Sequence, residues 1–361
     1  MGVLSKAHKY LVWFGAAYVI VLISLVHPLV QQELLYLRNV RMVDESTLSN
    51  PAAFGLSPYS TLNVKLNTSD GEHLGRLSYI SCAWHVLPKS LVKFDGSIEE
   101  QLIEDAFRSH LTVIFAHGNA ATRAMQGRVA TVNQLSTKLD ANVIAFDYRG
   151  IADIGKGFGD STGLPSEDGL TLDASAAYEY AISRGAVPEN IVLLGQSLGT
   201  GVMSNFAKKL SDQGVRVRAV VLAAPFSSIS KLLETYKIGG LFPLFSPMRS
   251  LPQIRDYLFT FLKHKYNTME NIQSISSAIL IAHSKDDLEI PLDHSLSLFK
   301  SQPGEVATRT ITTLTNQQWG VYNYINHPFK RAFLITENGG HNNVVSSEGF
   351  AEVVQNFITK V

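Results

Sequence analysis

One short stretch of the chain has the residue types and spacing of a nucleophilic site. Gly195-Gln196-Ser197-Leu198-Gly199 follows a run of apolar residues and precedes a helical pattern. In that context the stretch matches the Gly-x-Ser-x-Gly elbow, where the two glycines permit a tight turn and the serine projects from the end of a strand. We predict that Ser197 is a nucleophile, shaped by Gly195 and Gly199; the alternative is a chance match in an ordinary strand-to-helix turn.

A serine hydroxyl becomes a good nucleophile only when a base removes its proton. With this elbow, the order along the chain is serine, acid, histidine. His341 follows the last apolar run and two glycines, so we expect it to be the base. Asp286 and Asp287 follow the preceding apolar run. Asp287 lies four residues before Pro291, a spacing common in such turns, so we favour Asp287 over Asp286 as the acid that orients the imidazole.

The reaction also needs two backbone N–H groups that stabilise a negative oxygen. One should belong to Leu198, the residue after the nucleophile. We expect the other to come from Asn119, in the small-residue loop that includes Gly118 and follows an earlier apolar run. For His117, in the same loop, we expect a structural role through hydrogen bonds that shape the loop.

The candidate site residues lie at the ends of apolar runs that alternate regularly with helical segments. The apolar runs occupy residues 111–120, 141–150, 191–196, 217–226, 278–287 and 331–341, and the helical segments 122–139, 168–184, 200–211 and about 347–360. The alternation is typical of an α/β fold with a mostly parallel sheet and helices on both faces. Ligands of such sheets bind beyond the carboxyl ends of the strands, where the candidate residues lie. Residues 61–90 predict short strands around a turn at Asp70-Gly71.

The N-terminus differs from the rest. After a short tail (1–9), residues 10–30 are apolar over the roughly 20 positions that span a bilayer. We predict a transmembrane helix retained in the mature protein; a cleaved signal peptide and a buried core helix are the alternatives. Lys6 and Lys9 favour a cytoplasmic N-terminus, which places the main domain in the lumen. An amphipathic connector (31–60) would lead to that domain (61–361).

Composition excludes several function classes. The 31 basic and 31 acidic residues give no net charge, which argues against a nucleic-acid partner. The single cysteine, Cys82, rules out an intrachain disulfide and a cysteine-rich zinc site. The sequence has no zinc-protease pair of histidines and no nucleotide-binding glycine loop; the glycine-rich run 155–163 is interpreted as a plain loop. We expect no metal and no cofactor.

Residues 229–268 are too many for a plain connection. Leu, Phe and Tyr alternate there with Lys and Arg. We predict a helical cap over the site, with apolar surface for an acyl chain; a few ordinary core helices are the alternative.

The chain resembles the α/β-hydrolase superfamily and, within it, the family of α/β-hydrolase domain-containing protein 12 and its fungal relatives. The resemblance rests on "FAHGNAATRA", "FDYRG", "GDSTGLPSE", "GQSLGTGV", "LIAHSKDDLEIP" and "GGHNN", within residues 60–360. It implies a membrane-anchored serine hydrolase of lysophospholipids and monoacylglycerols, in the endoplasmic reticulum, that uses Ser197, Asp287 and His341. Its partners would be a monoacyl lipid substrate and the membrane.

Three stretches depart from the family pattern: 76–82, 151–157 and about 309–330. They are either surface loops or errors of the gene model. The second lies near the expected mouth of the cleft and therefore bears on substrate access.

Three functions fit the sequence. The first is an acyl-ester hydrolase of monoacyl lipids that forms an acyl-enzyme on Ser197. The second is a protein S-acyl thioesterase, which orientation would distinguish. The third is an inactive hydrolase fold that binds at the membrane, and it is disfavoured because all three triad positions are filled.

Overall fold

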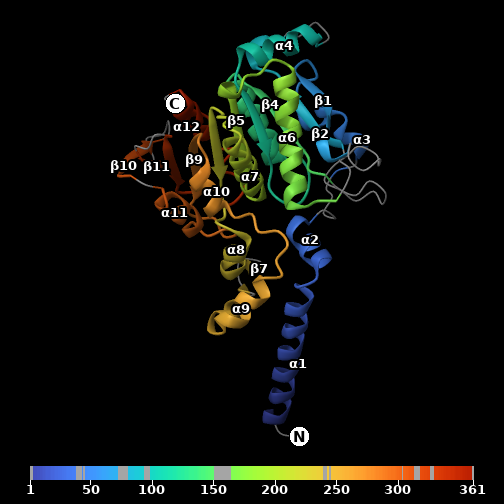
Figure 1. Ribbon diagram of the computed structural model, residues 1–361, viewed down its shortest axis with the longest axis vertical. Helices are drawn as coiled ribbons and strands as arrows, with labels where there is room; N and C mark the ends of the chain where they lie inside the picture. Colours follow the sequence, from blue (N-terminus) through green and yellow to red (C-terminus); the bar gives the residue numbers. More distant parts are fainter. Residues whose placement is uncertain are drawn as a thin grey trace.

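The computed structural model describes most of the chain around one central sheet (Figure 1). The described residues are 3–37, 43, 45–71, 80–92, 98–149, 164–238, 242–243, 245–302, 304–312, 318–325 and 329–359. A single helix, α1 (Val3–Ser24), projects away from the body that surrounds the sheet.

In the described part of the chain, the main sheet has ten strands in the order β1-β2-β4-β3-β5-β6-β9-β12-β11-β10. Their bounds are β1 Thr61–Asn67, β2 Ile80–Val86, β3 Thr112–Ala116, β4 Asn142–Phe146, β5 Ile191–Gln196, β6 Ala219–Ala223, β9 Ala278–Ser284, β10 Val306–Thr312, β11 Gln318–Ile325 and β12 Arg331–Thr336. The strands from β4 to β12 in this order pair in parallel, and the pairs at both ends are antiparallel. The predicted fold class, an α/β fold with a mostly parallel sheet, is confirmed.

Helices cover both faces of the sheet, and every residue of the central strands is therefore buried. In β5, Ile191 and Leu193 belong to one apolar cluster, whereas Val192 and Leu194 belong to a second cluster on the other face. The first cluster includes residues of α4 (Glu100–Ser109), α6 (Glu167–Ser183), α7 (Leu198–Asp212), α10 (Thr268–Ser274) and α11 (Asp293–Lys300). The second includes residues of α3 (Glu45–Leu48), α5 (Gln126–Lys138) and α12 (Glu348–Ile358).

The register of the sheet brings the site loops together. Ala116 at the end of β3 pairs with Gly195 of β5, so the loops after these two strands are neighbours. In the same way Thr336 of β12 pairs with Ser284 of β9. All four loops therefore emerge at the carboxyl edge of the parallel strands, where sheets of this kind bind ligands.

The apolar N-terminal segment is shorter as a helix than predicted. Its helix ends at Ser24, and a new helix, α2 (Pro28–Tyr36), starts after a turn. A proline is well tolerated in the first turn of a helix but interrupts one that runs through it, which explains the break. Residues 6–24 of α1 are long and apolar enough to cross a membrane, and they are almost entirely exposed.

The predicted connector is packed into the body. Tyr36 at the end of α2 is completely buried in the first apolar cluster. Its hydroxyl lies 3.0 Å from that of Tyr266. Leu48 of α3 is equally buried and joins the second cluster. Residues 38–42 and 44 lie outside the described residues.

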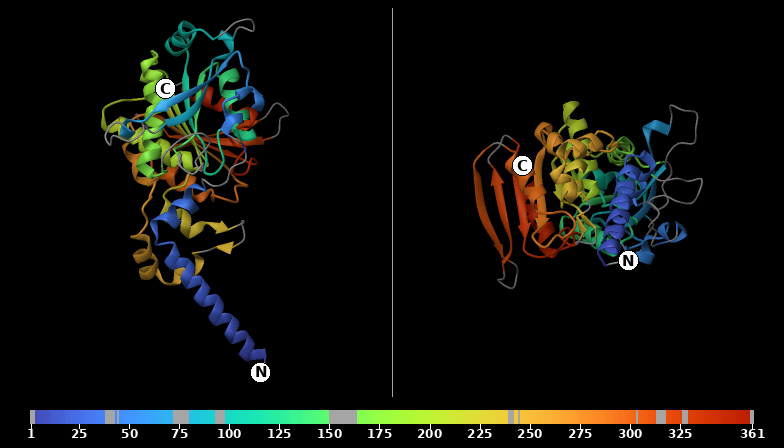
Figure 2. Two further views of the ribbon diagram at one scale, coloured as in Figure 1. Left: turned by 90° about the vertical axis from the view of Figure 1, so that its right-hand side faces the viewer. Right: turned by 90° about the horizontal axis from the view of Figure 1, so that it is seen from below.

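The stretch predicted as a surface insertion around 309–330 instead extends the sheet. β10 and β11 form an antiparallel hairpin, and β11 pairs with β12 (Figure 2). Its buried positions include Ile325, which packs into the core. The insertion at 151–157 and the glycine-rich run 155–163 lie outside the described residues, as does the part of 76–82 before β2.

Residues 229–268 form short elements on the side of the body from which α1 projects (Figures 1 and 2). They are α8 (Ile229–Thr235), the paired β7 (Lys237–Ile238) and β8 (Phe242–Pro243), a 3₁₀ turn at Ser246–Ser250, and α9 (Pro252–Phe259). The end of the segment returns to the core at Tyr266.

Candidate active site

Ser197 lies in the tight turn between β5 and α7. Its backbone has φ 51° and ψ −120°, a conformation that costs a non-glycine residue about 1–3 kcal/mol. The backbone N–H of Ser197 donates to the carbonyl of Ala223, which continues the pairing of β5 with β6. A strained turn that is hydrogen-bonded to the neighbouring strand in this way is typical of a nucleophile elbow.

The two elbow glycines are needed because the backbones around the turn touch. A Cβ on Gly195 would lie 2.3 Å from the carbonyl oxygen of Gly199. A Cβ on Gly199 would lie 2.0 Å from the carbonyl oxygen of Ala116. The loop glycine, Gly118, is also close: its Cβ would be 3.3 Å from Cβ of Ser197. Side chains at the two elbow positions would force the strands and the helix apart.

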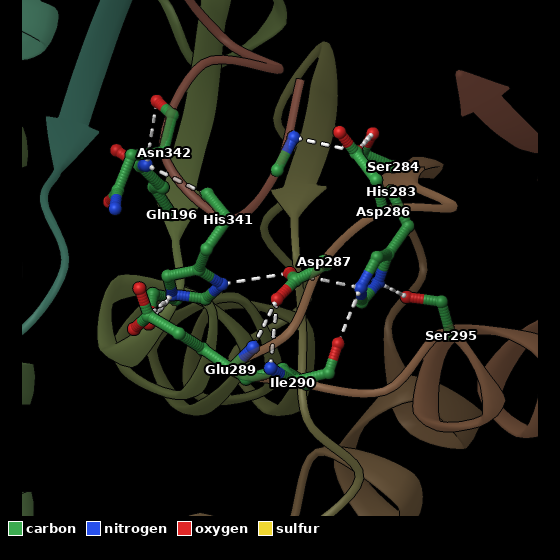
Figure 3. A network of polar contacts seen from close by, with 12 residues as sticks. Gln196, His283, Ser284, Asp286, Asp287, Glu289, Ile290, Ser295, His341 and Asn342 are labelled. Atoms are coloured by element: carbon green, nitrogen blue, oxygen red, sulfur yellow. Dashed lines mark hydrogen bonds and ion pairs between the residues drawn. The ribbon is translucent and has the colours of Figure 1, made fainter. Parts of the chain in front are cut away.

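Three loops bring Ser197, His341 and Asp287 into one hydrogen-bonded chain. Nε2 of His341 lies 2.8 Å from Oγ of Ser197. Nδ1 of His341 lies 2.8 Å from Oδ2 of Asp287 (Figure 3). With the proton on Nδ1 donated to the carboxylate, Nε2 is free to accept the serine proton. This is the order of contacts that general-base activation of a serine requires.

Asp287 is buried and held as a carboxylate. Its Oδ1 accepts hydrogen bonds from the backbone N–H groups of Glu289 and Ile290, both at 2.9 Å. Burial alone would raise the pKa of this carboxyl. Hydrogen bonds from His283, His341 and the backbone outweigh that effect and hold the pKa of Asp287 well below its ordinary value. The group is therefore ionised throughout the neutral range.

His341 is tuned in the opposite direction. Burial alone would lower its pKa, but the hydrogen bond and the negative charge of Asp287 raise the pKa above its ordinary value. A second carboxylate contributes: Oε2 of the half-exposed Glu289 lies 3.8 Å from Nε2 of His341. The imidazolium that forms when the base accepts a proton is thus stabilised from two sides.

The carboxylate of the alternative acid, Asp286, is hydrogen-bonded to groups other than the imidazole. Its carboxylate accepts hydrogen bonds from the hydroxyl of Ser284 and from the backbone N–H of Gly340 at 2.7 Å. Gly340 has φ 54°, so the histidine loop turns in the left-handed region here. Asp286 therefore holds the loop that carries His341, whereas only Asp287 contacts the imidazole.

The two residues expected to form an oxyanion hole lie in the turn after β5 and in the loop after β3. Leu198 is the first residue of α7, whose N–H groups have no acceptor within the helix. Within the described part of the chain, the N–H of Asn119 makes no hydrogen bond. The guanidinium of Arg128 donates to the carbonyls of Gly118, Asn119, Ala120 and Thr122, which fixes the backbone of this loop.

His117 has the expected hydrogen bonds within the loop. The residue is fully buried, with Nδ1 2.6 Å from the carbonyl of Gly118 and Nε2 3.0 Å from Oδ1 of Asp147. Asp147 also accepts hydrogen bonds from the backbone and side chain of Arg123. His117 contacts none of the three hydrogen-bonded residues, which agrees with a structural role.

Gln196 and His283 also support the site, although the sequence did not predict a role for them (Figure 3). Gln196, inside the elbow motif, donates to the carbonyl of Asn342 at 3.3 Å and so ties the serine turn to the histidine loop. His283 lies 3.2 Å from Oδ2 of Asp287, and its other nitrogen accepts from the hydroxyl of Ser295 at 2.6 Å. The signal for His283 was its place four residues before the acid on a buried strand.

Comparison with known proteins identifies relatives of this chain. A sequence model of the prolyl oligopeptidase family matches residues 128–318. The lysophosphatidylserine lipase ABHD12 of Danio rerio is 29% identical over 303 residues, which cover 82% of this chain and 73% of that protein. The protein ABHD12B of Homo sapiens is 34% identical over 244 residues, which cover 66% of this chain and 61% of that protein.

Solved structures share the fold. An α/β-hydrolase from Vibrio vulnificus superposes with a TM-score of 0.58 at 15% identity, covering 93% of this chain and 94% of its own. The esterase Pf2001 of Pyrococcus furiosus superposes with a TM-score of 0.54 at 15% identity, covering 86% and 95%. At this identity the likeness concerns the fold alone, and it confirms the α/β-hydrolase fold predicted from the sequence.

Proposed function

The chain belongs to the prolyl oligopeptidase family of α/β-hydrolases, and from this premise we propose that it is a membrane-anchored serine hydrolase that cleaves the acyl ester of monoacyl lipids. The observation that carries the proposal is the hydrogen-bonded chain from Ser197 through His341 to Asp287 at the strained elbow. Such a chain activates a serine for acyl transfer.

The reaction would proceed through an acyl-enzyme. As Oγ of Ser197 attacks the ester carbonyl carbon, its proton moves to Nε2 of His341, and the carbonyl oxygen becomes negative between the N–H groups of Leu198 and Asn119. The C–O bond to the alcohol then breaks, and His341 gives its proton to the departing oxygen. A water molecule, deprotonated by His341, then attacks the acyl carbon. The bond from that carbon to Oγ of Ser197 breaks, the fatty acid leaves, and His341 returns the proton to Oγ.

Each oxyanion donor would contribute roughly 3 kcal/mol to the stabilisation of the tetrahedral intermediate. Asp287 would stay ionised throughout, because the imidazolium that it stabilises carries the transferred proton.

The substrate class follows from the relatives and from the position of the site. Curated relatives are lysophosphatidylserine lipases, and the apolar helix α1 provides a membrane anchor. The N–H of Ala120, beside the oxyanion loop, donates to the carbonyl of Tyr36 at the end of α2. A nine-residue helix is about 14 Å long, so the site would lie about one short helix away from the membrane surface.

The domain arrangement and location form part of the proposal. The segment 229–268 would act as a cap between the site and the anchor. Lys6 and Lys9 precede the apolar span, which favours a cytoplasmic N-terminus and a domain in the lumen of the endoplasmic reticulum.

The first experiment is labelling of the full-length protein in a membrane fraction with a fluorophosphonate probe. We expect the wild type and a Ser211→Ala control, changed at the far end of α7, to be labelled and Ser197→Ala not to be. No labelling of a folded wild type would contradict an activated serine. Labelling of Ser197→Ala would place the reactive group elsewhere.

A substrate panel then separates the candidate functions. Lysophosphatidylserine, a monoacylglycerol, an S-palmitoylated peptide and a prolyl peptide amide should be compared in the same detergent. Faster turnover of the two monoacyl lipids supports the proposal. Preference for the thioester would favour a protein S-acyl thioesterase, and cleavage of the amide would favour a peptidase.

A further inference from the structure

Helix α9 and its flanks carry an exposed apolar stripe. Leu251, Ile254, Tyr257 and Phe261 are exposed by 46%, 50%, 64% and 38% of their surface. Their spacing of three, three and four residues places them on one face of the helix. The rings of Tyr257 and Phe261 are in contact at 5.2 Å. A contiguous apolar surface of this kind usually marks a contact with a partner or a lipid surface.

Two side chains of α9 share an apolar cluster with α1. Leu258 and Phe259 pack against the same cluster as Tyr18, Leu22 and Leu25, at the C-terminal end of α1. This cluster is separate from the two clusters that cover the sheet. Helix α9 therefore lies near the C-terminal end of the candidate membrane span, and Figures 1 and 2 show it beside that helix, away from the sheet.

One side chain fixes the end of the α9 segment to the start of α2. Nε2 of Gln31 donates to the carbonyl of Phe261 at 3.0 Å, and Oε1 of Gln31 accepts from the N–H of Lys263 at 2.9 Å. This pair of bonds sets the height of the segment relative to the end of α1.

That height can be estimated from the length of α1. A helix rises about 1.5 Å per residue, so Tyr18 lies about 9 Å along the axis from Ser24, where the candidate span ends. Amphipathic helices that bind membrane surfaces bury their apolar face about 5–10 Å deep. The cluster that α9 shares with Tyr18 and Leu22 thus places this helix within the outermost part of the span.

We propose that the α9 stripe (Leu251, Ile254, Tyr257 and Phe261) contacts the lipid bilayer directly, beside the membrane-spanning helix. The proposal rests on the proposed function, because it requires α1 to lie in the membrane. The occupant is lipid because the stripe belongs to a helix that lies beside α1, whose apolar residues Ile20 and Ile23 are likewise exposed. The exposed Lys263 and Lys265 follow the stripe, where ammonium groups can contact lipid phosphates.

The α9 segment is linked through α8 to the strand that supports Ser197. Arg255 of α9 pairs with Glu234 of α8 at 3.4 Å. Helix α8 follows β6 by a short loop, and the end of β6 accepts the hydrogen bond from the N–H of Ser197. The segment therefore connects the bilayer surface to the rim of the site.

The test uses the full-length protein in phosphatidylcholine vesicles containing phosphatidylserine. In a Cys82→Ala background, the only cysteine is removed, and spin labels are attached at Ile254→Cys and Tyr257→Cys. Matched controls are Gln253→Cys, an exposed polar neighbour on α9, and Val187→Cys, an exposed apolar residue in the loop before β5. We expect labels at 254 and 257 to collide more with oxygen than with a water-soluble nickel complex, and the controls to do the opposite.

The proposal is overturned if the protein is bound to the vesicles and the nickel complex reaches all four labelled sites equally. The proposal would also be overturned if the spin labels at 254 and 257 stay shielded from the nickel complex in detergent-free protein without lipid. Shielding under those conditions indicates contact with another copy of the protein.

Activity gives a second, independent measurement. The double variant Ile254→Asp/Tyr257→Asp should hydrolyse lysophosphatidylserine in vesicles about tenfold more slowly than the wild type. Its hydrolysis of water-soluble 4-nitrophenyl acetate and its fluorophosphonate labelling should be unchanged, which also shows that it folds. Equal losses on both esters, or no loss on either, would overturn the proposal. A wild type that hydrolyses neither ester contradicts the proposed function, while the spin-label result still decides whether α9 contacts lipid.

Discussion

At the scale of single residues, two carboxylates act on the imidazole of His341. Asp287 contacts Nδ1 directly, and Oε2 of Glu289 lies 3.8 Å from Nε2. Both raise the pKa of His341 against the lowering caused by burial. Because the proposed mechanism requires a neutral His341 to accept the serine proton, activity should be lost as the pH falls through this raised pKa.

We predict that Glu289→Gln moves the acidic limb of the pH–rate profile to lower pH. Removing a negative charge near the imidazolium lowers the pKa of His341, so more of the base is neutral in mildly acidic solution. The shift should be less than about one pH unit, since Glu289 is more than half exposed and solvent screens its charge. The measurement is kcat/KM for a soluble ester against pH. Glu305→Gln, an exposed change in another loop, is the control, and a shift towards higher pH would contradict the prediction.

Neighbouring aspartates should differ sharply in their effect on catalysis. Asp287→Asn removes the charge that orients and stabilises the imidazolium and should lower kcat by about 10⁴-fold. Asp286→Asn keeps an oxygen that can accept from the N–H of Gly340, so we expect a loss of less than about tenfold. Steady-state kinetics on a soluble ester would test this pair. Losses of similar size for both variants would contradict the assignment of Asp287 as the acid.

At the scale of the elements, the elbow is built from contacts between backbones. Gly199 lies where a Cβ would be 2.0 Å from the carbonyl oxygen of Ala116, so β3 and α7 approach each other without room for a methyl group. The turn at Ser197 and the loop at Gly118 are held together by the same approach. Backbone atoms cannot move aside as a flexible side chain can, so position 199 does not tolerate a side chain.

We therefore predict that Gly199→Ala destabilises the protein by at least about 3 kcal/mol and abolishes fluorophosphonate labelling. The matched control is Gly127→Ala in α5, where a Cβ would meet nothing within 4 Å. Alanine is the better helix former, so this control should be neutral or stabilised by up to about 1 kcal/mol. Thermal unfolding in detergent, followed by labelling, gives both results. A Gly199→Ala protein that unfolds at the wild-type temperature would show that the elbow can relax.

The hairpin β10–β11 covers what would otherwise be an open edge of the sheet. β11 covers the edge of β12, the strand that leads to His341. Without the hairpin, β12 would present an unpaired edge, which is prone to pair with other chains. The stretch that departs from the family pattern is thus a structural part of the sheet.

At the scale of the whole molecule, the orientation of the domain has a direct readout. Asn67 begins an Asn-Thr-Ser acceptor and is exposed at the end of β1. If the domain lies in the lumen, as we propose, this residue is accessible to glycosylation. We predict that the full-length protein from microsomes migrates faster after treatment with an N-glycosidase, and that Asn67→Gln removes the difference.

The complementary measurement is protease access. In intact microsomes the domain should be protected from an added protease and become sensitive when detergent opens the vesicles. Digestion of the domain before detergent, together with an unglycosylated Asn67, would place the domain in the cytosol and favour the thioesterase hypothesis.

Much of the fold and of the candidate site could be predicted because it depends on local sequence. The flanking glycines of Ser197 specify a strained turn, and the alternation of apolar runs with helical segments predicts a parallel sheet covered on both faces. Chain order then predicted His341 as the base, and the spacing to Pro291 favoured Asp287 over Asp286 as the acid. The apolar segment ahead of residue 24 identified a possible membrane span from composition alone.

Only the tertiary structure decided what depends on packing between distant segments. It separated Asp286 from Asp287, placed Glu289 near His341, and set Gln196 against the histidine loop. It also brought α9 against α1 and added the hairpin to the sheet. A turn is determined by the few residues within it, whereas contacts between segments far apart in the sequence are determined by how all the elements pack, which no local pattern contains.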